Sequence, residues 1–78
     1  MLKIREDVDL KELEKFGFEK KISYGGTFYE RWYRTVGYSI DKNGILYKLK
    51  DLGPYTEEFK ITKQDISRLD IADLIEME

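Results

Sequence analysis

The chain has 78 residues with 14 basic and 16 acidic side chains, and its net charge of -2 gives no overall field that would attract nucleic acid or an anionic membrane. Cysteine and histidine are absent, which excludes disulfides, thiolate metal sites and the commonest general base. The length predicts one domain over residues 1–78. The first residues hold no signal-peptide core, and no apolar run reaches the about 18 residues of a membrane span. No membrane contact is therefore expected, and the expected location is a reducing cytoplasm.

Residues 8–18, VDLKELEKFGF, predict a short N-terminal helix. Asp9 is the expected N-cap, and Glu12 follows at the spacing of a capping box. Gly17 takes the place of a left-handed residue just after the helix, and a Schellman motif would then bring Phe18 onto Leu13. So short a helix is not stable alone, so its apolar side is expected to dock on other structure.

From residue 18 the hydrophobic period changes to two, which predicts strands. Between residues 28 and 40, the parity that holds Phe28, Trp32 and Tyr38 is the more apolar and is assigned to the core face. This parity does not slip along the stretch. One long strand, bent near Gly37, is therefore expected.

A glycine-containing turn is expected to join the first two strands. A three-residue loop over residues 24–26 offers glycine for the left-handed bulge position. This loop pairs Ile22 with Phe28 and sets Glu19 opposite Arg31, an opposite-charge pair. A two-residue loop over 25–26 would mix the two faces, so the three-residue loop is preferred.

The sequence Asn-Gly at residues 43–44 is the strongest hairpin signal in the chain and is typical of a type I′ turn. A two-residue loop there pairs Tyr38 with Leu49 and Ile40 with Tyr47. These pairs all lie on the apolar parity, so turn chemistry and hydrophobic pattern agree.

Beyond the Gly-Pro step at residues 53–54, the alternation over residues 59–61 favours a short fourth strand. The tail predicts a helix that begins with Thr62 and Asp65 at capping-box spacing. Its apolar residues point in two directions. The helix is therefore either buried on two sides or broken near Asp70.

These elements predict a single α+β domain with a short N-terminal helix, an antiparallel β-meander of three to four strands and a C-terminal helix packed on one sheet face. The residues expected on the covered face are Phe18, Ile22, Phe28, Trp32, Tyr38, Ile40, Tyr47 and Leu49.

The opening, LKIREDVDLKELEKFGFE, resembles the start of a group of small uncharacterised proteins encoded by phages and mobile elements of Gram-positive bacteria. In that group a helix ending in Lys-Phe-Gly-Phe precedes an aromatic-rich sheet and a C-terminal helix with a Leu-Asp-x-x-x-Asp-Leu-Ile pattern. This chain has LDIADLI at residues 69–75, which is one residue shorter. The resemblance implies an α+β fold and a phage-like origin. The group has no assigned activity, so it transfers no functional residues.

The second parity of the central stretch presents Tyr29, Arg31 and Tyr33, and the expected registers place Lys21 and Lys48 on the same side. Exposed tyrosine and arginine are typical of protein interfaces. The leading hypothesis is therefore a non-enzymatic protein-interaction module that contacts an unidentified protein, for example one of a host, or its own copy in a homodimer.

Two alternatives remain open for this row of residues. Aromatic side chains beside arginine and lysine stack bases and hold phosphates, which would allow binding of single-stranded nucleic acid. The row would otherwise be a solvated or helix-covered face whose tyrosines serve strand formation. No nucleic-acid-binding signature supports the first of these.

The carboxylates of the tail are expected to be structural. Asp65, Asp70 and Asp73 match no metal-binding motif, and acidic residues near helix starts are usually caps. So small a chain leaves little room for a pocket beside its core. No catalytic residue, cofactor or metal ion is therefore expected.

Overall fold

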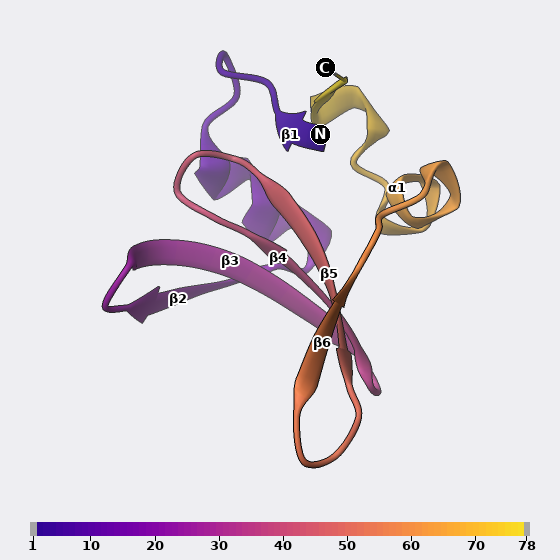
Figure 1. The fold of residues 1–78 in the computed structure, drawn as a ribbon. Coiled ribbons are helices and arrows are strands. Elements are labelled where there is room, and N and C mark those ends of the chain that lie inside the picture. The colour runs from indigo at the N-terminus through magenta and orange to yellow at the C-terminus, as the bar shows by residue number, and fades with distance from the viewer. Residues whose placement is uncertain (1, 78) are drawn as a thin grey trace.

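The computed structural model describes residues 2–77, and strands make up most of it (Figure 1). In chain order the elements are β1 (Leu2–Ile4), the 3₁₀ segment η1 (Leu10–Phe16), β2 (Glu19–Ser23), β3 (Gly26–Tyr33), β4 (Val36–Ile40), β5 (Leu46–Asp51), β6 (Thr56–Phe59), α1 (Lys63–Leu69), the 3₁₀ turn η2 (Ala72–Leu74) and β7 (Ile75–Met77). One antiparallel sheet has the order β2-β3-β4-β5-β6, and β1 pairs with β7 in a second sheet.

This architecture corrects the expected fold class. The expected N-terminal α-helix is a 3₁₀ segment, the meander has five strands in place of three to four, and a two-stranded sheet joins the two ends of the described chain. The one α-helix in residues 2–77 is α1, so the fold is mostly sheet and α+β only in the loosest sense. Figure 1 places η1, β1, β7 and α1 on the same side of the five-stranded sheet.

The residues expected to cap the N-terminal segment do so, although its helix type differs and the expected capping box of Asp9 with Glu12 is not formed. The Asp9 side chain accepts a hydrogen bond from the Lys11 backbone N–H at 3.0 Å. Gly17 ends the segment in the left-handed region with φ of 86°. The Phe18 N–H donates to the Leu13 carbonyl at 3.2 Å, as the Schellman expectation required. Caps depend only on local sequence. Length does not decide the helix type, because the α-helix over Lys63–Leu69 also has seven residues.

The central stretch is two strands, which corrects the expectation of one long bent strand. The chain reverses at residues 34–35, so that Tyr33 pairs directly with Val36. Arg34 takes a left-handed conformation with φ of 55°, although no glycine, asparagine or proline marks the turn. A two-residue turn brings odd positions of β3 onto the same face as even positions of β4. Phe28 and Trp32 therefore lie on the face opposite to Tyr38.

The hairpin between β2 and β3 also differs from both loops considered from sequence. Its connection is residues 24–25, because Ser23 pairs with Gly26, which has φ of 111°. Ile22 therefore faces Thr27 in place of Phe28, and the expected opposite-charge pair of Glu19 and Arg31 does not form.

The Asp41 side chain determines the length and register of the turn between β4 and β5. Ile40 pairs with Leu46, one residue away from the partner expected for an Asn-Gly type I′ turn. The Asp41 carbonyl accepts from the Gly44 N–H at 2.9 Å, and an Asp41 side-chain oxygen accepts from the Ile45 N–H at 3.0 Å. The Asp41 side chain also accepts from the Asn43 N–H, so one aspartate holds a longer turn whose left-handed residue is Gly44.

The core lies between the five-stranded sheet and the elements on its covered side. Its buried apolar members are Ile4, Leu13, Phe18, Tyr29, Tyr38, Ile40, Leu46, Ile66, Leu69 and Ile71. Of the expected core, Phe18, Tyr38 and Ile40 are confirmed. The prediction is wrong for Ile22 and Trp32, which have 81% and 40% of their surface exposed. Three further residues are only half-buried: Phe28, Tyr47 and Leu49. The reversal at residues 34–35 explains Phe28 and Trp32.

The tail follows the second of the two expected alternatives, because the helix breaks at Asp70. Asp70 ends α1 with φ of 63°, and η2 and β7 follow. The Thr62 and Asp65 capping box is present: the Thr62 hydroxyl accepts from the Asp65 N–H at 3.3 Å, and the Asp65 side chain accepts from the Thr62 N–H at 2.9 Å.

Candidate functional site

The row predicted for binding does not form as an exposed surface. Tyr29 keeps only 4% of its surface exposed, because the face expected to be open is the one that the other elements cover. Burial is also the main reason that the pKa of the Tyr29 hydroxyl is raised, followed by the charges of Glu14 and Asp9. Arg31 is half-buried and Tyr33 is exposed near the end of β3.

Arg31 serves the fold. Its guanidinium donates a hydrogen bond to the carbonyl of Phe16, the last residue of η1. It also lies over the Tyr33 ring, with 4.6 Å between the guanidinium carbon and the ring centroid. Gly17 allows this contact, since a Cβ added there would be 3.2 Å from the Arg31 Nε. Arg31 thus fastens η1 to β3, and its charge satisfies a carbonyl at the end of the segment.

Lys48 is engaged inside the molecule as well. Its ammonium lies 3.1 Å from both side-chain oxygens of Asp65, and the Tyr38 hydroxyl donates to the same carboxylate at 2.7 Å. Asp65 is the one buried charged residue described, and its Thr62 partners complete its hydrogen bonds. The cluster therefore connects β4 and β5 to the first turn of α1.

The pKa values of this cluster follow from its contacts. Burial by itself would raise the pKa of Asp65, but hydrogen bonds from the Thr62 backbone, Tyr38, Lys48 and the Thr62 hydroxyl outweigh it and lower the pKa to about 2. Burial, together with the hydrogen bond to Asp65, raises the pKa of Tyr38 to about 12. At neutral pH Asp65 is therefore ionised and Tyr38 is protonated, so the hydroxyl donates and the carboxylate accepts.

Lys21, the last of the predicted binding residues, lies on the other side of the sheet. It pairs with Phe28 across the β2–β3 ladder, and its ammonium lies 3.3 Å from a carboxylate oxygen of Glu19. The five predicted residues are therefore divided between two faces, and the structure does not bring them together.

The uncovered side of the five-stranded sheet carries a different set of aromatic residues, which we call the open face. Its members include Glu19, Lys21, Phe28, Glu30, Trp32, Ser39, Tyr47, Leu49 and Glu58, which share a side according to the strand pairings. The buried core residues all lie on the covered side or in the elements over it. The open face therefore carries aromatic residues that no described element covers.

Trp32 lies on the open face near the end of β3, directly over Gly37. The two residues are cross-strand partners, and a Cβ added to Gly37 would come within 2.6 Å of the indole ring. The glycine thus lets the indole lie against the sheet backbone. A tryptophan opposite a strand glycine is a known pairing in sheets. A cross-strand pair of Trp32 and Gly37 requires the chain to turn between them. The spacing of these two residues is therefore the sequence feature that could have indicated the turn at residues 34–35.

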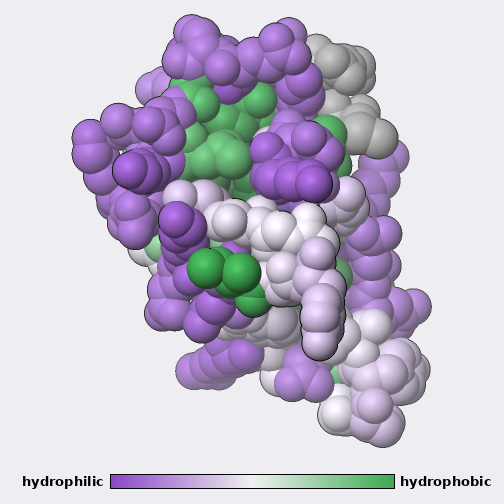
Figure 2. Space-filling view, turned by 90° about the vertical axis from the view of Figure 1, so that its left-hand side faces the viewer, coloured by the Kyte–Doolittle hydropathy of each residue, from purple (hydrophilic) through white to green (hydrophobic). Residues whose placement is uncertain are grey.

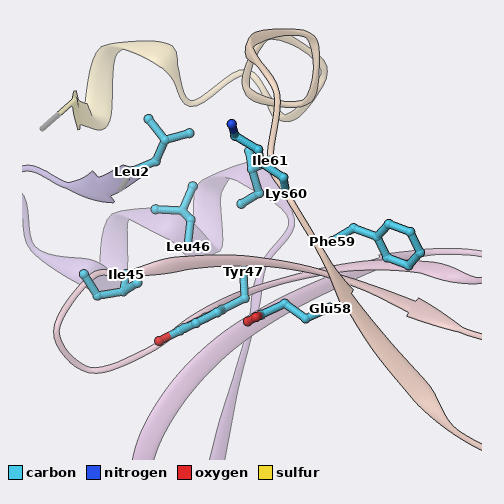
Figure 3. Close-up of a pocket in the computed structure, with 8 residues that line it drawn as sticks. All are labelled: Leu2, Ile45, Leu46, Tyr47, Glu58, Phe59, Lys60 and Ile61. Atoms are coloured by element: carbon cyan, nitrogen blue, oxygen red, sulfur yellow. The ribbon is translucent and has the colours of Figure 1, made fainter.

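A shallow cleft of about 310 Å³ lies along β5 between β1 and β6. Its lining residues, labelled in Figure 3, are Leu2, Ile45, Leu46, Tyr47, Glu58, Phe59, Lys60 and Ile61. In Figure 3, Leu2, Leu46 and Ile61 lie near one another, while Phe59 points away from them. Leu2 and Ile61 also pack against the core. The cleft lies at the margin of the core.

Two further structural findings concern residues 2–77. No three acidic side chains converge there as metal ligands would. Among these same residues, no helix is long and apolar enough to cross a membrane.

Comparison with known proteins gives no relative. No protein-family model matches this chain, and neither a curated protein nor a solved structure is similar to it.

Proposed function

We propose that this chain is a non-enzymatic protein-interaction module that contacts its partner through the open face. The observation that carries the proposal is the half-exposed Trp32 near the end of β3 on that face, with Leu49 beyond its partner Gly37 and Phe28 further along the same strand. This surface replaces the row of Tyr29, Arg31 and Tyr33.

The composition of the open face is typical of an interaction surface. Aromatic side chains are enriched in protein interfaces, and tryptophan is among the residues that contribute most to binding. Charged residues lie among the apolar ones: Glu30 is between Phe28 and Trp32 on the same side of β3, and Glu58 is opposite Leu49.

The nucleic-acid alternative receives no supporting observation. Arg31 donates to a backbone carbonyl, Lys48 is paired with buried Asp65, and Lys21 on the open face lies 3.3 Å from a carboxylate oxygen of Glu19. A phage-like origin and a host protein as partner remain predictions from the opening residues.

Affinity capture from host-cell lysate tests the proposal, with nuclease-treated and untreated arms. The wild-type chain is compared with Trp32→Ser on the open face and with Tyr55→Ser, an exposed aromatic in the loop after β5. We expect Trp32→Ser to weaken capture at least about tenfold, as loss of an aromatic anchor does. Tyr55→Ser and nuclease should leave capture unchanged.

The tryptophan also reports binding directly. Trp32 is the only tryptophan in the chain, so its fluorescence should move to shorter wavelength when a purified partner covers the open face. Circular dichroism confirms that both variants are folded. Equal capture by Trp32→Ser and Tyr55→Ser, with no spectral change, would contradict the proposal.

A further inference from the structure

The five-stranded sheet ends in two strands that have one neighbour each. Among residues 2–77, β2 pairs only with β3 and β6 pairs only with β5. Every residue of β2 and of β6 is exposed. The free backbone N–H and C=O groups along such edges are a template for a strand of another chain.

The two edges carry opposite charges. Lys20 and Lys21 occupy the middle of β2, and Glu57 and Glu58 occupy the middle of β6. Charged side chains usually protect an edge from pairing with its own kind. Here each edge repels its like but attracts the other. Within the described chain Glu57 and Glu58 form no ion pair, and the exposed pair of Lys21 with Glu19 is of a kind that contributes little.

The direction of the strands permits the two edges to meet. All four neighbouring pairs in the sheet are antiparallel, so β2 and β6 run in the same direction. A second copy displaced sideways along the sheet, without being turned over, brings its β2 alongside β6 as a parallel neighbour. Its covered face then stays on the same side as that of the first copy.

One register matches the side chains on both faces. The pairs are Lys20 with Glu57, Lys21 with Glu58, and Ile22 with Phe59. Lys20 and Glu57 are both on the covered side, because they face Tyr29 and Lys50 within their own sheet. The register therefore joins opposite charges on each side of the sheet and places one apolar residue against another.

The apolar pair accounts for an unusual exposure. Ile22 is 81% exposed, and Phe59 is the exposed aromatic at the end of β6. Figure 2 looks onto the side of the molecule where the β2–β3 hairpin extends, and it shows a larger hydrophobic area in the upper part and a smaller one below, each with hydrophilic residues around it. A partner strand that covers such a side chain removes apolar surface from water.

We propose that β6 of one copy of this chain accepts β2 of a second copy as a parallel strand, so that the sheet continues from chain to chain. The contact uses two different patches of the molecule. Repetition of such a contact gives a ring where the rotation closes and an open chain where it does not.

Charge exchange combined with sedimentation tests the contact. At low salt the weight-average mass of the wild type should rise at least about twofold with concentration, and it should fall again at 1 M salt, where charges are screened within about 3 Å. The variant Lys20→Glu/Lys21→Glu and the variant Glu57→Lys/Glu58→Lys should each stay monomeric. A mixture of the two should associate, because every β2 then meets a β6 of opposite charge.

The matched control changes the net charge as much as Lys20→Glu/Lys21→Glu does, at exposed positions outside both edge strands. Lys11→Glu/Lys63→Glu should associate as the wild type does. A wild type that remains monomeric at low salt, or a mixture of the two charge-reversed variants that fails to associate, would overturn the proposal. Far-UV circular dichroism establishes that each variant is folded.

The absence of cysteine makes a test of register possible. Mixing Ile22→Cys with Phe59→Cys under mild oxidation should give a covalent dimer of the two variants, because paired residues on neighbouring strands lie within disulfide distance. Ile22→Cys mixed with Thr56→Cys should not, since Thr56 is three residues away along β6. Equal yields from the two mixtures would reject this register.

Discussion

Trp32 and Gly37 form a pair in which each residue depends on the other. The indole lies against the sheet because its cross-strand partner has no Cβ, and Gly37 is buried beneath it. The aromatic side chain in turn compensates for a glycine in the interior of a strand, which would otherwise weaken the strand.

This dependence predicts a non-additive pair of substitutions. Gly37→Ala should lower the free energy of unfolding by about 1–3 kcal/mol, because the new Cβ displaces the indole. The same change should cost clearly less in a Trp32→Ala background, where nothing is displaced. Urea unfolding followed by circular dichroism measures the cycle. Equal costs in the two backgrounds would show that the indole does not lie over Gly37.

The sequence alone does not indicate which side of β3 faces the core. Phe28 and Trp32 alternate with Tyr29 and Tyr33, so both sides of the strand are aromatic. Preferring the more apolar side put Trp32 in the core and Tyr29 in solvent. A tyrosine also packs well when its hydroxyl reaches the margin of the core.

The α1 helix is joined to the sheet by a charge as well as by apolar packing. Ile66 and Leu69 are buried, and Asp65 in the same turn receives hydrogen bonds from Tyr38 and Lys48. The Asp65 side chain is only 6% exposed, so solvent weakens these contacts little.

The docking of α1 should therefore depend on pH in the acid range. The pKa of Asp65 is lowered to about 2 in the folded chain, against an ordinary value of 3.8. The stabilisation is complete above the unfolded pKa and is lost as pH falls through the folded one. It amounts to about 2 kcal/mol between pH 5 and pH 2, at about 1.4 kcal/mol for each unit of pKa difference.

Urea unfolding of wild type and Asp65→Asn at a series of pH values isolates this carboxylate. Asp65→Asn should be the less stable protein at pH 6, because it leaves Lys48 without its partner. The difference between the two proteins should shrink towards pH 2. A difference that does not change with pH would mean that Asp65 titrates normally.

Among the elements, those set by local chemistry could be predicted and those set by pairing could not. The caps at Asp9, Gly17 and Thr62 follow from residues a few positions apart. The reversal at residues 34–35 contains no glycine, asparagine or proline. It could not be predicted from turn propensity, because the pairing of β3 with β4 holds Arg34 in a left-handed conformation. The Asp41 side chain changed the register of the Asn-Gly hairpin, which turn propensity alone does not anticipate.

In the whole molecule, the candidate binding surface lies on the face of the sheet opposite to the one expected from sequence. The expectation assigned the wrong side of β3 to the core. The sequence contained the right residue types for an interaction surface, but the hairpin at residues 34–35 decides which of them reach solvent. The covered side receives β1, η1, α1 and β7, and the open face receives no described element.

The pairing of β1 with β7 also has a kinetic consequence. Leu2 meets Met77, so this contact closes a loop that contains nearly all of the chain. The hairpins of the meander close far shorter loops, and contacts between distant residues form slowly because their loop-closure entropy is larger. The two-stranded sheet should therefore assemble after the transition state for folding, as a latch on a meander that is already formed.

Folding and unfolding rates measured by stopped flow separate the two steps. Ile4→Ala in β1 should mainly speed unfolding, whereas Asp41→Ala in the β4–β5 turn should mainly slow folding. The reverse pattern would mean that the chain ends meet first. If β1 and β7 pair last, the five-stranded sheet exists for a time while its covered side is still partly open. The opposite charges of β2 and β6 are already present at that stage, so they favour contacts between unlike edges and oppose contacts between like ones.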